Sequence, residues 1–201
     1  MKKAKKSVRK NFIAEQYRKS WNFIKESKKY IWASVFIFFL FVLIGFFIPI
    51  PDTLKNSLFD MLKNILGQVK DLSWFGMIKF IFLNNLQSSF LGMILGVFFG
   101  VFPVVIAVIN GYVLGFVASI AVGSGGIGSL WRIFPHGIFE LPAVFISLGL
   151  GIKLSTFILK KKKFDSLKEF FWEGLRVFLF VIIPLLIIAA IIEGSLIFLL
   201  K

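Results

Sequence analysis

The sequence predicts an all-α protein: a polytopic transmembrane helix bundle with five spans and short amphipathic interfacial helices. Of its 201 residues, 58% are hydrophobic and only 17% are charged, whereas soluble domains are roughly 45–50% apolar and about 25% charged. Several uncharged runs are long enough to cross a bilayer, which takes about 20 residues. Basic residues gather beside these runs, as the positive-inside rule describes.

Residues 1–29 carry eleven of the 24 Lys and Arg residues, which indicates a cytoplasmic segment. Apolar residues recur within it at helical spacing: Phe12, Ile13, Tyr17, Trp21 and Ile24. This pattern predicts a basic amphipathic helix on the membrane surface, with anionic lipid head groups as partners. A solvated tail is the alternative, most of all for residues 1–10.

The net charge of +14 also raises the question of nucleic-acid binding. The charge is concentrated at the ends of apolar runs, however, and no helix-turn-helix, aromatic stacking platform or zinc finger is visible. We therefore expect the lipid bilayer, and no nucleic acid, as the partner of these charges.

The first span is expected at residues 30–48, an uncharged run that Pro49 and Pro51 end. Residues 52–79 carry mixed charge and are expected to contain an interfacial helix. Its apolar positions have helical spacing: Leu54, Leu58, Leu62, Ile65 and Val69.

The second and third spans are expected at residues 80–102 and 104–131. No charged residue occurs from Ile81 to Trp131, and residues 80–122 alone would form a helix of about 65 Å, roughly twice the hydrocarbon thickness. The chain must therefore cross twice. The turn lies either near Gly100–Pro103 or at Asn110-Gly111, and the sequence leaves both open.

The fourth span is expected at residues 137–159, with Lys153 extending its amine toward the nearby interface. Residues 160–176 are charged, and Ser166 with Glu169 fits a capping box for a short surface helix. The apolar face of that helix is Leu167, Phe171 and Leu175. The fifth span is expected at residues 177–200.

The expected localisation is the cell membrane, with a cytoplasmic N-terminus and an extracytoplasmic C-terminus. Residues 1–29 and Lys160–Lys163 are both strongly basic, so both should be cytoplasmic. An even number of crossings must separate them, and the four spans between them satisfy this condition. The fifth span then places the C-terminus outside.

Five glycines are expected at helix–helix contacts, because small residues four apart let helices approach closely in lipid. They are Gly92, Gly96, Gly100, Gly111 and Gly115. Packing within one chain is favoured over a homodimer interface, and the homodimer remains an alternative.

The chemically most informative residues are His136, the only histidine, and Glu140. They are four residues apart, so they share a helical face and can hydrogen-bond. Ionisable residues at membrane depth are costly and are candidates for function. On the expected topology they share the outer half of the bundle with Asn84, Asn85 and Glu193, and we expect an intramembrane polar cluster, either functional or structural.

The segment Pro135-His136-Gly137-Ile138-Phe139-Glu140-Leu141-Pro142-Ala143 resembles the signature of the stage II sporulation protein M family. Further matches are Gly149-x-Gly151-x-x-Leu154, Asn84-Asn85 and Asn110-Gly111-x-x-x-Gly115, and the resemblance extends over residues 31–200. In spore-forming bacteria the family member is a membrane scaffold that recruits peptidoglycan-degrading enzymes during engulfment. The resemblance therefore implies a scaffold with membrane or envelope partners, and it supplies no catalytic residues.

We expect a non-enzymatic membrane protein that scaffolds or regulates partners, including other membrane proteins. The alternative is a small transporter or channel in which His136, Glu140 and Glu193 handle protons or cations. No nucleophile–base pair, metal-binding motif or cofactor motif is evident, so no catalytic residue, metal or cofactor is expected.

Overall fold

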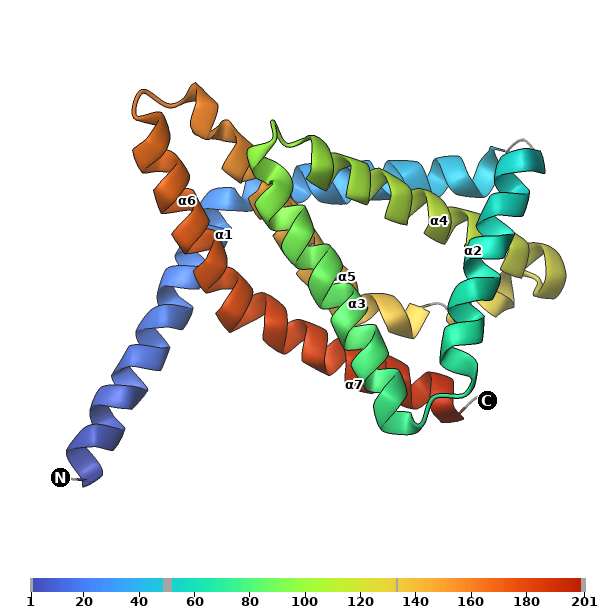
Figure 1. The fold of residues 1–201 in the computed structure, drawn as a ribbon, viewed down its shortest axis with the longest axis horizontal. Coiled ribbons are helices and arrows are strands. Elements are labelled where there is room, and N and C mark those ends of the chain that lie inside the picture. Colours follow the sequence, from blue (N-terminus) through green and yellow to red (C-terminus); the bar gives the residue numbers. More distant parts are fainter. Residues whose placement is uncertain (1, 49–51, 133, 200–201) are drawn as a thin grey trace.

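The computed structural model of the protein describes residues 2–48, 52–132 and 134–199. Within these ranges it describes all side chains except those of residues 2–11, 52–54, 62, 65–66, 131–132 and 134–139. The main elements are seven α-helices (Figure 1): α1 (Lys2–Phe47), α2 (Asp52–Lys70), α3 (Trp74–Ile94), α4 (Val101–Gly125), α5 (Phe134–Ser155), α6 (Lys163–Val177) and α7 (Ile183–Leu199). No strand occurs in these described ranges. Five segments are long and apolar enough to span a membrane, which confirms the predicted fold class.

The five candidate spans alternate in direction. Gly111 of α4 lies against Phe38 of α1, and Gly115 lies against Val42, so α1 and α4 are parallel. The pairs Ile31–Gly149 and Ser34–Phe145 make α5 antiparallel to α1. Helix α3 runs parallel to α5, because Ser89 pairs with Ser147 and Gly96 with Gly151. It runs antiparallel to α7, because Trp74 pairs with Ser195 and Phe90 with Phe178.

This alternation gives the bundle two ends. One end, here called the basic end, holds the α3–α4 turn and the α5–α6 loop with Lys160–Lys163; the basic part of α1 leads into it. The opposite end, here called the far end, holds the last turns of α1, α4 and α7 and the first turn of α3. The basic part of α1 and Lys160–Lys163 are thus both at the basic end, as expected when an even number of spans separates them.

The turn between the second and third spans lies at Phe98–Gly100, the first of the two predicted alternatives. The 3₁₀ helix η1 (Leu95–Val97) ends α3, and Phe99 and Gly100 both have positive φ, 57° and 72°. Gly100 adopts this left-handed conformation without the steric cost of a Cβ atom and leads directly into α4. Asn110 and Gly111 lie inside α4.

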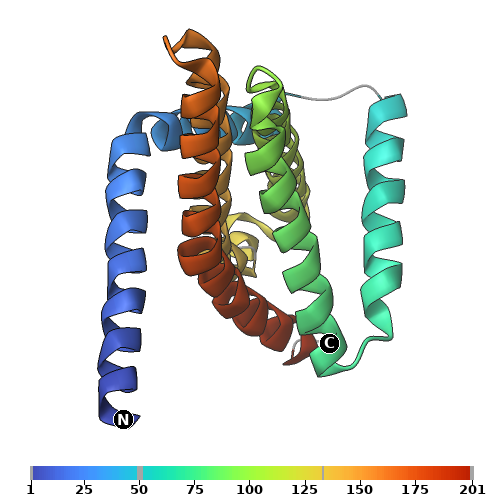
Figure 2. The ribbon, with the colours of Figure 1, turned by 60° about the vertical axis from the view of Figure 1, so that its left-hand side comes forward.

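The basic N-terminal segment and the first span form one continuous helix, with no break at residues 29–30. The helix instead bends where its basic part gives way to its apolar part (Figures 1 and 2). In this region the Ser27 hydroxyl donates to the Phe23 carbonyl four residues earlier, a bond that competes with the helix ladder and bends helices. The two predicted segments are therefore two parts of one helix.

The predicted surface helix near residues 160–176 is present as α6, but the predicted capping box is wrong. The helix begins at Lys163, three residues before Ser166, and its N-cap residue is Lys162, without a side-chain cap. At its other end α6 continues through the π-helix η4 (Phe178–Ile182) into α7. The charged segment and the fifth span therefore form one continuous helical segment.

Helix α2 connects α1 to α3 across the far end, and its Phe59 ring packs against Phe116 of α4 with 5.7 Å between ring centroids. Figure 2 shows α2 and the basic part of α1 on opposite sides of the bundle. The start of α3 at Trp74, rather than near residue 80, follows from capping, because the Ser73 hydroxyl accepts the Gly76 N–H. Lys79 is exposed within its second turn.

Backbone-to-backbone contacts pack the spans. A Cβ atom added at Gly96 would collide with the backbone of Gly151, and one added at Gly115 would collide with the Val42 carbonyl. Gly45 and Gly149 lie equally close to neighbouring helices. Such close approach increases dispersion contact where lipid offers little hydrophobic driving force. The glycine stripes are therefore used for packing inside this chain.

Candidate functional site

The predicted polar residues fall on three helices at the far half of the bundle. The Ser147–Ser89 hydrogen bond fixes the register of α5 against α3. Because the two helices are parallel, Glu140 is level with Phe82 two helical turns earlier, close to Asn84 and Asn85 along α3. Glu193 precedes Gly194, which packs on Ile78 of α3. Glu140 and Glu193 are each half-buried.

The two asparagines differ in exposure. Asn84 is exposed on the surface of the bundle, whereas Asn85 is half-buried. Residue 136 lies in the first turn of α5, and the His136 side chain is outside the described part, as is its expected bond to Glu140. The structure thus brings the elements of the cluster to neighbouring levels, and the cluster itself stays a prediction. Among the described residues no three His, Asp or Glu side chains gather as a metal site.

A second polar site, which the sequence did not predict, centres on Lys153 near the basic end. Its side chain is only 7% exposed, so its amine is covered by protein rather than extended into water as a snorkelling lysine would be. Its Nζ atom lies 3.7 Å from the centroid of the Phe23 ring and 5.3 Å from that of Phe170. The Glu26 carboxylate approaches to 3.7 Å.

This arrangement joins three helices, α1, α5 and α6, through one cation. A cation over an aromatic face contributes about 0.5–2 kcal/mol, with the larger value for desolvated sites. The Glu26 carboxylate is 69% exposed, so its ion pair with Lys153 contributes little, typically below about 1 kcal/mol. The aromatic rings and the packed stem of Lys153 therefore dominate this junction, here called the Lys153 junction.

The basic part of α1 uses one narrow face for this contact. Ser20, Phe23 and Ser27 are buried, and the first and last are fully enclosed. Tyr17 also reaches Phe180, with ring centroids 5.8 Å apart. Serines at a spacing of seven, continued by the buried Ser34, keep a small-residue stripe on one side of the helix. This stripe was the sequence signal that could have revealed the contact.

The rest of the same segment is exposed, and it includes aromatic residues that the sequence predicted to meet lipid. Phe12 and Trp21 are each more than half exposed. Exposed basic residues surround them: Arg18, Lys19, Lys25, Lys28 and Lys29. A basic helix with an exposed aromatic face suits an anionic membrane surface or an acidic partner.

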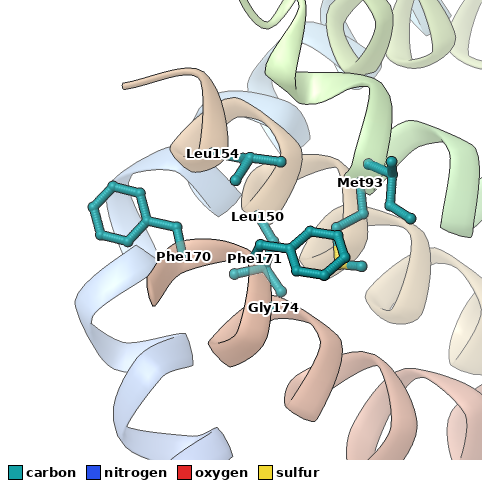
Figure 3. Close-up of a pocket in the computed structure, with 7 residues that line it drawn as sticks. Met93, Leu150, Leu154, Phe170, Phe171 and Gly174 are labelled. Carbon is teal, nitrogen blue, oxygen red and sulfur yellow. The ribbon is translucent and has the colours of Figure 1, made fainter. Parts of the chain in front are cut away.

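Helix α6 separates two environments at the basic end. Figure 3 shows Phe170 pointing toward α1 and its neighbour Phe171 pointing toward Met93 of α3. A small cavity beside these side chains is lined by residues of α3, α5 and α6. One face of α6 thus belongs to the Lys153 junction, and the other faces the α3–α4 turn.

Apolar helices that alternate through a glycine-packed bundle, with basic segments at one end, define a polytopic α-helical integral membrane protein. Neither a curated protein nor a solved structure matches the chain. The model of the stage II sporulation protein M family matches residues 34–196. The chain belongs to this family, which confirms the resemblance found in the sequence.

Proposed function

We propose that the protein is a non-enzymatic membrane scaffold that holds a basic aromatic helix at the cytoplasmic membrane surface and organises partner proteins there. One observation carries this proposal: the basic part of α1 is fixed to the bundle along one face and exposes Trp21 and several lysines away from that face, while Phe12, nearer its start, is also exposed. A surface presented in this way is free to contact lipid and partners at the same time.

The bundle supplies the rigidity that a scaffold needs. Its helices approach so closely that glycine hydrogens lie against neighbouring carbonyls, as at Gly111 with Phe38 and Gly115 with Val42. Because these glycine stripes are occupied within one chain, a homodimer would have to use another surface.

The orientation in this proposal places the basic end in the cytoplasm and the C-terminus outside. The basic part of α1 and Lys160–Lys163 lie at the same end of the bundle, and cytoplasmic loops carry the excess of Lys and Arg. The anionic cytoplasmic leaflet would then attract the exposed lysines of α1. Family members in spore-forming bacteria recruit envelope enzymes, which supports a scaffold without identifying the partner here.

A transporter is the second candidate, and the half-buried carboxylates of Glu140 and Glu193 favour it. Charged groups at a helix centre are disfavoured by roughly 2.5–3.5 kcal/mol, so they are kept for a structural or functional reason. A hydrogen-bonding role tolerates Glu140→Gln. A proton- or cation-coupled role does not, because it needs the ionisable group.

Reconstitution in liposomes with a pH-sensitive dye separates these two candidates. The scaffold proposal expects no proton or cation flux from the wild type and the same thermal stability, within about 1 kcal/mol, for Glu140→Gln. Flux by the wild type that a well-folded Glu140→Gln protein lacks would contradict it.

Photo-crosslinking in native membranes tests the scaffold directly. A photoreactive residue at position 21, on the exposed face, is expected to give discrete protein adducts. The same residue at position 20, where Ser20 is buried against the bundle, is the matched control and should react only within the chain. Equal adduct patterns at both positions would count against the exposed face as the partner surface.

A further inference from the structure

An apolar groove lies at the basic end on the side of α6 away from α1. Seven residues from α3, η1, α5 and α6 line it: Ile94, Val97, Leu154, Phe164, Leu167, Lys168 and Phe171. All but Lys168 are apolar, and the groove has a volume of about 370 Å³. This volume lies within the range of sites that bind small organic ligands, about 300–1,000 Å³.

The wall formed by α6 is one helical face. Phe164, Leu167, Lys168 and Phe171 follow the spacing i, i+3, i+4, i+7, which lines up side chains along one side of a helix. Phe164, at the start of α6, is 84% exposed, and Leu159, at the end of the preceding 3₁₀ helix (Thr156–Leu159), is 85% exposed. Large apolar side chains exposed beside a lysine run are what membrane-interface depth accommodates, where acyl chains meet head groups.

The first part of α6, together with the loop before it, carries net positive charge. Residues 160–169 contain five lysines, Lys160–Lys163 and Lys168, against two carboxylates, Asp165 and Glu169, which leaves a net charge of +3. Lys168 is itself part of the wall. An occupant that complements this site has an extended apolar chain and an anionic group at one end.

We propose that the groove binds an anionic phospholipid, with an acyl chain against the apolar wall and the phosphate beside Lys168. Basic pockets between transmembrane helices on the cytoplasmic side suit such head groups. The site is separate from the aromatic face of α1, so it does not depend on the scaffold proposal. A helix of a partner protein would match the apolar wall but would not require the lysines.

Native mass spectrometry of the full-length protein with added phosphatidylglycerol or phosphatidylcholine of identical acyl chains tests the site. The wild type is expected to retain one phosphatidylglycerol in preference to phosphatidylcholine. Lys168→Gln should reduce its retention about fivefold, as loss of one basic contact implies. Leu167→Trp, which fills the groove, should reduce it more than tenfold.

Two matched controls lie outside the groove. Lys63→Gln removes an exposed lysine of α2 at the far end, and Leu83→Trp enlarges an exposed leucine of α3; both should retain phosphatidylglycerol as the wild type does. If Leu167→Trp fails to fold, Val97→Phe narrows the groove from its other wall.

Equal retention of the two lipids, or unchanged retention in Lys168→Gln and the groove-filling variant, would overturn the proposal. A second copy of the chain as occupant has its own signature. The protein has no cysteine, so Phe164→Cys would then crosslink into a dimer that phosphatidylglycerol does not suppress, and this outcome would also overturn the proposal.

Discussion

The two parts of α1 meet the rest of the protein in different ways. Its apolar part packs backbone to backbone on α4, where Gly111 and Gly115 lie against the Phe38 and Val42 carbonyls. Its basic part touches α5 and α6 through side chains, with Phe23 under the Lys153 amine as the central contact. The same helix is therefore fixed rigidly along its apolar part and held by a single narrow face along its basic part.

This difference shows that backbone contacts anchor α1 among the spans, whereas side-chain contacts hold its basic part in place. Backbone contacts at glycines cannot adjust to a larger side chain, so the glycine contacts of the apolar part tolerate no larger residue. Side-chain contacts at the Lys153 junction can be weakened in steps without separating the spans. Substitutions in the two parts should accordingly produce different kinds of damage.

The largest effect is expected from Gly115→Leu. The new side chain would collide with the Val42 carbonyl and force α1 away from α4, which should lower the free energy of unfolding by about 4 kcal/mol or more. Thermal unfolding in detergent measures the loss. Gly123→Leu, in the same helix but with open space around the glycine, should change stability by less than about 0.5 kcal/mol; similar losses in both variants would refute the backbone-contact interpretation.

A smaller and more local effect is expected from Phe23→Ala. Loss of a buried phenylalanine typically costs about 3–5 kcal/mol, but here the loss should loosen the basic part of α1 while the spans stay folded. Limited proteolysis should cleave faster at Arg18, Lys19 and Lys25, with little change in thermal unfolding of the bundle. Trp21→Ala, on the exposed face of the same helix, is the control and should leave cleavage unchanged.

A smaller effect than that of Phe23→Ala is expected from Lys153→Ala. This substitution removes the cation over Phe23 and the packed stem, and it should destabilise the junction by about 2 kcal/mol. The same cleavage assay measures it, with the exposed Lys28→Ala as control. Glu26→Gln should matter less than Lys153→Ala because Glu26 is largely exposed. A larger effect of Glu26→Gln would show that the ion pair, rather than the aromatic contact, holds the junction.

The spans were predictable from the sequence because hydropathy is a local property and lipid requires long apolar helices. The α3–α4 turn was not decided, since glycines occur both at Gly100 and at Gly111; only the helix contacts show that Gly111 is needed inside a span. Lys153 illustrates a second limit. A lone lysine near the end of an apolar helix commonly reaches for water, and nothing nearby in sequence reveals that Phe23 approaches from a helix about 130 residues away.

The predicted polar residues also show which features follow from the sequence and which do not. Their place on α3, α5 and α7 followed from counting spans, whereas their exposure did not. Asn84 and Asn85 are adjacent in the sequence, yet a difference of one residue rotates a side chain by about 100° around a helix. Without the packing of α3 on its neighbours, the exposed Asn84 and the half-buried Asn85 cannot be distinguished.

The π-helix at Phe178–Ile182 has a consequence for how this chain can vary in length. A π-turn accommodates one extra residue inside an α-helix. A regular α-helix of the same sequence would rotate the following helix by about 100°, which would turn Gly194 away from Ile78 of α3. Removing one residue from the π-turn would leave both flanking faces in place. This short segment is therefore where the last span should accept a single-residue deletion, while a deletion closer to Gly194 should misalign the end of α7 with α3.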